Sequence, residues 1–378
     1  MIKEYKKFKQ KLITINWDRT WKEEKEILDQ LKFSREKLPS NSIYDSVLQY
    51  KSQTYFLKFW QKLFLWVISF FGLCYLIFSN FTFKFREKYN PKKYDIAYFY
   101  SDKIFNERKK VEKRLIFIES KAGLLFFNDI KFLFSVLIKI NFNFSLLSIA
   151  TYRIAQVRYA LNRYSIDEVW CNMEYSAASG ILHEYCRTHN LKLANFMHGE
   201  KVLTLRDTFC SFDTLHVWDE HYKILFETMF CNAKIVIDNP WLDETKFRKN
   251  NEKSICYILK GIESDDEVVN INKYLLKLKK CGFDIKIKEH PRNNNMSKKI
   301  QGFEMVENVI NVSDVFPQFQ FIMGQYSTVL TQAWFVNYNI IVDDITNPLL
   351  FKALKGRNYI FSEDRKHVTY FSSFLKSL

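Results

Sequence analysis

The segment FDIKIKEHPRNNN, residues 283–295, ends a run of alternating isoleucines and lysines on His290, Pro291 and Arg292. Proline keeps the preceding residue extended and cannot donate to a β-ladder, so a strand is expected to stop here. In open parallel sheets, ligands bind beyond the carboxyl ends of the strands. His290 is therefore predicted to face a ligand, and the planar guanidinium of Arg292 suits a phosphate. The alternative is an ordinary turn.

A second strand end follows about 30 residues later, in the segment FIMGQYSTVL. Gly324 permits a close backbone approach, and Ser327 and Thr328 begin a predicted helix, where free N–H groups and hydroxyls bind anions. The alternative is a simple helix cap. Both motifs follow strands of one predicted domain. They predict a site for a nucleotide phosphate that consists of His290, Pro291, Arg292, Gly324, Ser327 and Thr328.

Candidates for acid–base chemistry lie at strand ends nearer the N-terminus. His198 and Glu200 flank a glycine turn in NFMHGEKV, and either can take a proton from a hydroxyl group. Glu174, which follows another predicted strand together with Asn172, is the reserve candidate for this base. The alternative for His198 and Glu200 is a turn with solvated side chains.

Three further polar residues, Asp219, Glu220 and His221, are interpreted mainly as the acidic first turn of a helix. His183, Cys186 and His189 are spaced three apart on a predicted helix. A fourth zinc ligand is not apparent, so we interpret them as ordinary helix residues.

Several familiar ligand motifs are absent from the sequence. It has no Gly-x-Gly-x-x-Gly, no Walker loop and no Asp-x-Asp pair for a metal-bound nucleotide diphosphate. We therefore predict neither a cofactor nor a metal. The lysines are scattered along the sequence and do not form a basic stripe interleaved with aromatic residues. No nucleic-acid partner is therefore predicted.

Alternating strands and helices must position these residues, and this order predicts parallel sheets covered by helices. The predicted strands cover residues 94–101, 114–120, 167–174, 191–199, 212–219, 233–240, 255–261, 283–290, 319–324 and 339–344. The predicted organisation has three parts: a helical accessory region at 1–89, an acceptor-binding Rossmann-like domain at 90–245, and a nucleotide-donor Rossmann-like domain at 246–378.

Composition sets limits on the partners and the compartment. The 378 residues suffice for two domains, and the net charge of +15 favours anionic partners. The seven cysteines include no Cys-x-x-Cys pair, which is typical of reduced thiols in a cytoplasmic setting. The N-terminal residues lack the apolar run of a secretory signal.

Residues 63–83 contain no charged side chain and lie between Lys62 and Lys84. As a helix, this segment would be about 31 Å long, which matches one hydrocarbon core. We expect it to span a membrane or to lie on one. The alternative is a helix buried within the protein.

The pair KEHPR and GQYSTVL resembles the His-Pro and Ser-Ser/Thr motifs of bacterial GT-B glycosyltransferases that use CMP-activated donors. These are sialyltransferases and polysialyltransferases, with the capsule Kdo transferases more distant. The resemblance covers residues 90–378. It implies two Rossmann-like domains facing a central cleft, no metal, and a place at the cytoplasmic face of the bacterial inner membrane. It also implies that His290, Ser327 and Thr328 bind the donor phosphate.

One motif of those sialyltransferases, an Asp/Glu-Asp-Gly that supplies the base, is not found here. His198 and Glu200 stand at the matching strand end. The resemblance implies a metal-independent, inverting transfer of a sialic acid or similar acidic sugar to a surface glycan of an O-antigen, capsule or lipooligosaccharide. The expected partners are a nucleotide-sugar donor, a glycan or lipid-linked acceptor and the membrane surface. The alternatives are a teichoic-acid-type CDP-polyol phosphotransferase and a non-catalytic scaffold for polysaccharide assembly.

Overall fold

The computed structural model describes residues 17, 19–39, 41–82, 92–99, 115–118, 122–240, 253–261, 263–290, 300–306 and 315–378. The chain divides into two compact units. The first unit contains Met1–His198 and Leu203–Asp238, and the second contains Gly199–Val202 and Asn239–Leu378. The domain boundaries predicted at 89/90 and 245/246 lie outside the described residues.

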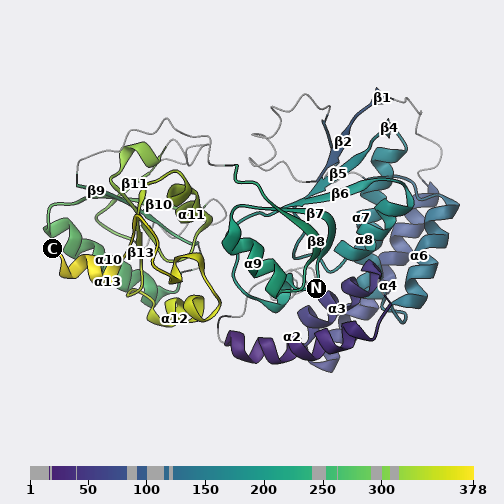
Figure 1. The fold of residues 1–378 in the computed structure, drawn as a ribbon, viewed down its shortest axis with the longest axis horizontal. Helices are drawn as coiled ribbons and strands as arrows, with labels where there is room; N and C mark the ends of the chain where they lie inside the picture. Colours follow the sequence, from purple (N-terminus) through teal and green to yellow (C-terminus); the bar gives the residue numbers. More distant parts are fainter. Residues whose placement is uncertain are drawn as a thin grey trace. The chain divides into compact units, whose positions relative to one another are not determined.

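The first unit is built on a parallel sheet with the strand order β3-β2-β5-β6-β7-β8 (Figure 1). Its strands are β2 (Ile96–Tyr98), β3 (Leu115–Phe117), β5 (Glu168–Cys171), β6 (Lys192–Phe196), β7 (Ser211–Val217) and β8 (Asn232–Ile237). A two-stranded ribbon, β1 (Lys92–Lys93) with β4 (Tyr164–Ser165), is separate from it. Strands β5 and β6 are almost entirely buried, which explains their continuous apolar sequence.

The helices of the first unit are α2 (Trp21–Glu36), α3 (Ser42–Thr54), α4 (Phe59–Thr82), α6 (Phe127–Lys139), α7 (Phe144–Leu161), α8 (Ser179–Thr188) and α9 (Glu220–Thr228), with a short 3-10 turn at Leu205–Asp207. Thr20 and Glu23 form a capping box at the start of α2. Asn41 caps α3 by accepting a hydrogen bond from the backbone of Ile43.

Helix α8 crosses α3 closely. The N-cap of α8 is Ala178, which makes no side-chain hydrogen bond. The hydroxyl of Ser179 donates to Oε1 of Gln49 in α3, at 3.0 Å. A Cβ atom on Gly180 would lie 1.9 Å from the backbone oxygen of Ser42, so this close crossing requires glycine. The N-terminal helices are thus part of the first unit.

The second unit has a parallel sheet with the strand order β11-β10-β9-β12-β13-β14 (Figure 1). Its strands are β9 (Ser254–Ile258), β10 (Asp284–Lys288), β11 (Glu304–Met305), β12 (Phe321–Gly324), β13 (Asn339–Val342) and β14 (Val368–Tyr370). Its helices are α10 (Asp265–Lys280), α11 (Thr328–Phe335), α12 (Pro348–Gly356) and α13 (Phe371–Lys376), with 3-10 turns at Phe316–Gln318 and Ile360–Ser362.

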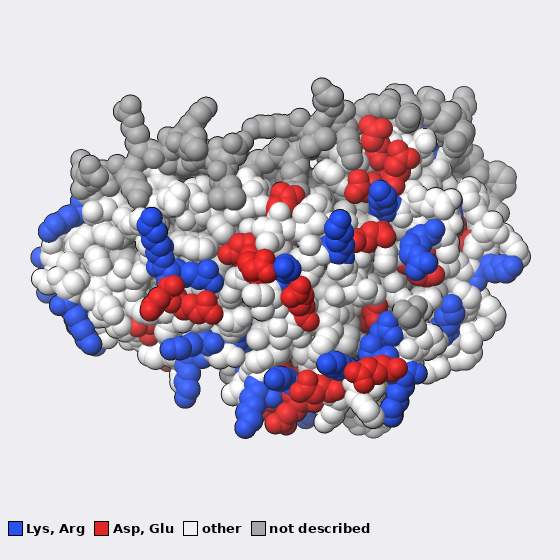
Figure 2. Space-filling view, in the orientation of Figure 1, with Lys and Arg blue, Asp and Glu red and all other residues white. Residues whose placement is uncertain are grey.

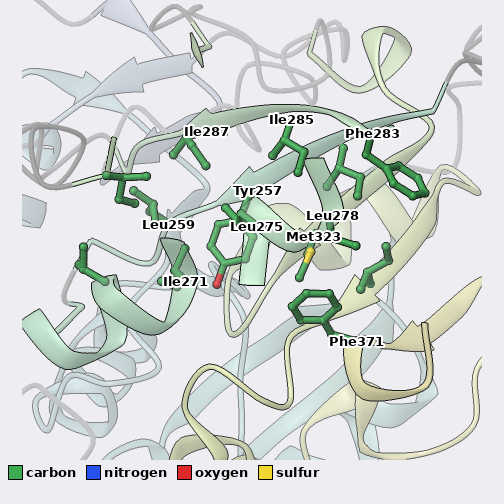
Figure 3. Close-up of a cluster of buried hydrophobic side chains, with 14 residues drawn as sticks. Tyr257, Leu259, Ile271, Leu275, Leu278, Phe283, Ile285, Ile287, Met323 and Phe371 are labelled. Atoms are coloured by element: carbon green, nitrogen blue, oxygen red, sulfur yellow. The ribbon is translucent and has the colours of Figure 1, made fainter. Parts of the chain in front are cut away.

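The core of the second unit lies between its sheet and helices α10 and α13 (Figure 3). Tyr257 and Ile287 come from the sheet, Leu275 comes from α10, and Phe371 comes from α13, and all four are at most 1% exposed. Helix α10 ends at a glycine turn, in which Gly282 adopts a φ of +87°.

These two parallel sheets with their helices confirm the predicted α/β class and the ten predicted strands. The predicted apolar helix is present as part of α4. Within the described residues, no helix is both long enough and apolar enough to cross a membrane. One side of α4 packs against α7 and buries Leu65 and Leu73. On the face shown in Figure 2, basic and acidic side chains are interspersed.

Candidate active site

The first unit pairs two of the predicted residues, Glu174 and His198. Nδ1 of His198 lies 2.8 Å from Oε1 of Glu174. The glutamate side chain is completely buried, whereas the histidine side chain keeps 30% of its surface exposed. The ring nitrogen is at contact distance but is not aligned for a hydrogen bond. Catalytic hydrogen bonds are often misaligned in this way before substrate binds.

The carboxylate of Glu174 is fixed by two donors from β6 and the residues after it. Nδ2 of Asn195 donates to Oε2 at 3.1 Å, and the backbone N–H of His198 donates to Oε1 at 3.3 Å. Because the strand ends that carry Glu174 and His198 are neighbours in a parallel sheet, both residues meet at one edge. A buried carboxylate behind a partly exposed imidazole is the arrangement of a histidine base that is oriented by a third group.

Helix α3 supports this edge from the N-terminal part of the chain. Nε2 of Gln49 donates to the backbone oxygen of Glu174 at 2.7 Å. Nε2 of Gln53 donates to the backbone oxygen of Tyr175 at 2.9 Å. The ring of Tyr175 contacts the His198 imidazole edge-to-face, with centroids 5.3 Å apart. The loop that carries Glu174 is therefore held from both the sheet and α3.

In the second unit, the strand order reverses at β9 and β12. When its strands are numbered along the chain, their order in the sheet is 3-2-1-4-5-6. In sheets with this order, nucleotides bind at the carboxyl ends of the strands on either side of the reversal. Lys260 follows β9 and Gln325 follows β12, and Nζ of Lys260 donates to Oε1 of Gln325 at 2.8 Å. The same ammonium group contacts the carboxylate of Glu267.

The carboxylate of Glu267 contacts this lysine, and hydrogen bonds through Gln325 and Thr346 continue from it to Asp343. Burial alone would raise the pKa of Glu267, but hydrogen bonds from Lys260 and Asn347 outweigh burial and hold the pKa below its usual value. Asp343, which follows β13, accepts hydrogen bonds from the Tyr257 hydroxyl at 2.5 Å and from the Thr346 backbone at 3.0 Å. Burial nevertheless raises the pKa of Asp343.

Glu263 and Lys260 are polar residues at this edge that our sequence interpretation missed. Glu263 is 9% exposed, and its Oε1 accepts hydrogen bonds from the backbone of Lys260 and Gly261. Within the described part of the chain, its other oxygen has no hydrogen-bond partner. Both residues closely follow the strand at 254–258, so the rule that selected His290 would also have selected them.

His290 lies beside Gly261 at the ends of β10 and β9. Gly261 has a φ of +81°, and a Cβ atom there would be 2.7 Å from Cβ of His290. The neighbouring strand end thus packs directly against the histidine. Pro291 and Arg292 lie outside the described residues.

Ser327 and Thr328 begin α11, as predicted. The hydroxyl oxygen of Ser327 accepts from the backbone of Val329 at 3.2 Å, and that of Thr328 accepts from the backbone of Glu200 at 2.9 Å. Oxygens that accept in this way can still donate their own protons to an anion. The close backbone approach predicted at Gly324 is present, and the neighbouring backbone is that of β9. A Cβ atom on Gly324 would lie 2.9 Å from the backbone oxygen of Ile258.

Glu200 belongs to the second unit, unlike His198. Its carboxylate accepts a hydrogen bond from the Thr331 hydroxyl, and its backbone oxygen accepts from Tyr326 at 3.1 Å. The residue is only 7% exposed. These contacts anchor the loop at residues 199–202 to α11.

The remaining candidates have local partners. Asp219 caps α9, as predicted, by accepting from the backbone of Tyr222. Glu220 pairs with Lys223, and His221 and Asn172 are buried. The two histidines of α8 contact different residues: His183 contacts Ser42 and Asp213, while His189 contacts Arg158. Over the described ranges, no group of three or more His, Cys, Asp or Glu residues is arranged to hold a metal ion.

No protein-family model and no curated protein sequence matches the chain. It is similar to the wall teichoic acid polymerase TagF (H548A), with 14% identity, a TM-score of 0.44, and 84% of this chain and 87% of that chain covered. A UDP-GlcNAc 2-epimerase from Neisseria meningitidis has 14% identity and a TM-score of 0.41 over 72% and 90% of the two chains. An α/β-galactoside α-2,3-sialyltransferase from Photobacterium phosphoreum has 11% identity and a TM-score of 0.37 over 75% and 100%. Similarities of this size assign no activity to the chain.

Proposed function

We propose that this protein is a metal-independent glycosyltransferase that moves an acidic sugar from a CMP-activated donor to a hydroxyl of a surface glycan. The observation that carries the proposal is the pair of Glu174 and His198. A buried carboxylate that contacts a partly exposed imidazole is the arrangement expected of a general base that activates a hydroxyl.

Of the two bases predicted from the sequence, we assign the role to His198. Its ring is open to solvent on one side and has a carboxylate behind it. Glu200 is buried and already accepts a hydrogen bond from Thr331. A carboxylate in that position stabilises its loop rather than collecting protons from a substrate.

The second unit offers the features expected of a nucleotide site. Its strand order places His290 and the start of α11 at the edge where nucleotides bind in such sheets. The N-terminus of α11 carries the partial positive charge of a helix, which suits a phosphate. The unpartnered oxygen of Glu263 suits a ligand hydroxyl, such as those of a ribose.

In the proposed reaction, His198 accepts the proton of the acceptor hydroxyl while the oxygen attacks the anomeric carbon. The bond between that carbon and the phosphate oxygen of CMP breaks with its electron pair, and CMP leaves as an anion. His290 and the positive end of α11 offset the developing negative charge. A direct displacement of this kind inverts the anomeric configuration.

A CDP-polyol phosphotransferase is the second candidate. The same imidazole would activate a polyol hydroxyl, and the attacked atom would be the β-phosphorus, so that CMP leaves again. The chemistry of His198 is common to both reactions. A non-catalytic scaffold is the third candidate, and the carboxylate behind His198 counts against it because a scaffold needs no such pair.

Thermal unfolding with added nucleotides tests the proposal. We would compare CMP, CDP, UDP and GDP in the presence of EDTA. A ligand at one hundred times its Kd should stabilise the protein by about 2.7 kcal/mol. We expect CMP to raise the Tm most. A preference for CDP would favour polyol-phosphate transfer, a response to UDP or GDP alone would contradict the CMP donor, and no response would favour the scaffold.

Gly261→Ala should weaken nucleotide binding because the added methyl group displaces His290. Gly282→Ala is the matched control, since Gly282 has a similar φ of +87° but no atom within 4 Å of the added Cβ. Both variants should lose about 1 kcal/mol of stability from the positive φ. Only Gly261→Ala should reduce the CMP-dependent rise in Tm. If CMP raised the Tm of both variants equally, the assignment of His290 to the nucleotide site would be wrong.

A further inference from the structure

Helix α6 exposes an apolar stripe instead of burying it. Phe127, Ile130, Phe134 and Ile138 recur at helical spacing and are 80%, 41%, 61% and 53% exposed. The opposite side of the helix buries Leu133 and Val136. A stripe of four large apolar side chains on the outside of a helix marks an interaction surface.

Helix α4 exposes a second apolar stripe. Its members are Phe59, Trp60, Leu63, Phe64, Trp66, Val67, Phe70 and Phe71, each at least 38% exposed. Trp60 and Phe71 are the most exposed, at 74% and 66%. The stripe extends from the edge of α4 that meets Phe144 of α7 around the side turned away from Leu65.

The α4 stripe contacts the residues that follow α6. Nε1 of Trp66 in α4 donates to the backbone oxygen of Phe142, three residues after the end of α6, at 3.3 Å. The ring of Phe144 contacts the rings of Trp66 and Phe70, with centroids 5.0 and 5.2 Å away. Figure 1 draws α4 and α6 at the same side of the first unit. We name the two stripes together the α4–α6 face.

The exposed charged side chains on these two helices are all positive. Lys62 in α4 and Lys131 and Lys139 in α6 are exposed, as is Lys58 just before α4. The sequences of α4 and α6 contain a single acidic residue, Asp129, which is fully buried and paired with Arg158. The α4–α6 face is therefore apolar, rich in aromatic residues and edged by lysines.

We propose that the α4–α6 face docks the protein onto a bilayer that contains anionic lipids, with both helices lying in the interface. Aromatic residues prefer the level of the headgroups, and lysines are attracted to anionic headgroups. A second copy of the chain fits this face less well, because a two-fold interface would bring the same lysines together. The proposal rests on this surface alone and is independent of the proposed reaction.

Vesicle co-sedimentation tests the proposal. The purified protein would be mixed with vesicles of phosphatidylcholine, or of phosphatidylcholine with 30 mol% phosphatidylglycerol. We expect binding to the anionic vesicles, weakened about tenfold or more in the double variant Phe127→Glu and Phe134→Glu. The control is the double variant Val269→Glu and Leu349→Glu, two residues of the second unit that are 65% and 80% exposed. Unchanged binding of the α6 variant would overturn the proposal.

Lysine variants separate the electrostatic part of the binding. Lys131→Gln and Lys139→Gln should each weaken binding to anionic vesicles by roughly fivefold and leave binding to neutral vesicles unchanged. Light scattering measures the oligomeric state of the same samples, and circular dichroism verifies that each variant is folded. If the α6 variant turned a dimer into a monomer and the wild type bound no vesicles, the face would be a protein interface and the proposal would be wrong.

Discussion

His198→Ala is expected to lower the rate of transfer by about 10²–10⁴-fold, because the acceptor hydroxyl loses its general base. The nucleotide-dependent rise in Tm should persist, since the nucleotide features described above belong to the second unit, whereas His198 belongs to the first. Steady-state rates and thermal unfolding of the same preparation measure the two effects. The loss should fall mainly on kcat.

Glu174→Gln tests the residue behind the imidazole. The amide retains the size of the side chain but removes the negative charge that would offset the proton taken up by His198 during the reaction. We therefore expect a loss of about tenfold or more in kcat. Glu220→Gln is the control, because Glu220 is an exposed carboxylate paired with Lys223 in the same unit. A kcat equal to that of the wild type would limit Glu174 to a structural role.

His290→Ala is expected to have the second large effect. Loss of a group that offsets charge on the departing nucleotide should cost about 10²–10³-fold in kcat/KM. The rise in Tm with CMP should also diminish. His290→Asn retains a hydrogen-bond donor and should retain part of the activity. If His290→Ala had full activity and unfolded like the wild type, the proposal that the end of β10 binds the nucleotide would be wrong.

The main architecture was predictable because most of its strands are short runs rich in apolar residues, continuous or alternating, and separated by polar turns. Ten strands were recognised in this way. β11 and β14 escaped recognition because they have two and three residues and pair at the edges of the sheet, where no long apolar run is needed. The start of α3 is not evident from the sequence, because Asn41, which caps the helix, also fits a loop.

The candidate site was predictable only in part. The rule that ligands bind beyond strand ends selected Glu174, His198 and His290 as separate candidates. It could not pair the first two, because the pairing depends on which strands are neighbours in the sheet. Nor could it show that Glu200 is held by Thr331, a residue 131 positions further along the chain.

The packing partners of the N-terminal helices also could not be predicted from the sequence pattern. Amphipathic spacing predicts that a helix such as α2 packs against something, but not against what. Gln49 reads as an ordinary polar residue of a helix. In the structure it is completely buried, and it donates to the backbone of Glu174, 125 residues away. Hydrogen bonds of this kind are specified by the tertiary fold rather than by local sequence.

The most direct test of the account is CMP release from a CMP-sugar and from CDP-glycerol, with an acceptor glycan and EDTA present. The account predicts acceptor-dependent release from the CMP-sugar by the wild type, and release by His198→Ala at less than about one hundredth of that rate. Release from CDP-glycerol alone would replace the sugar donor with a polyol-phosphate donor. Equal release by wild type and His198→Ala would contradict the central claim, which is that Glu174 and His198 form the catalytic base.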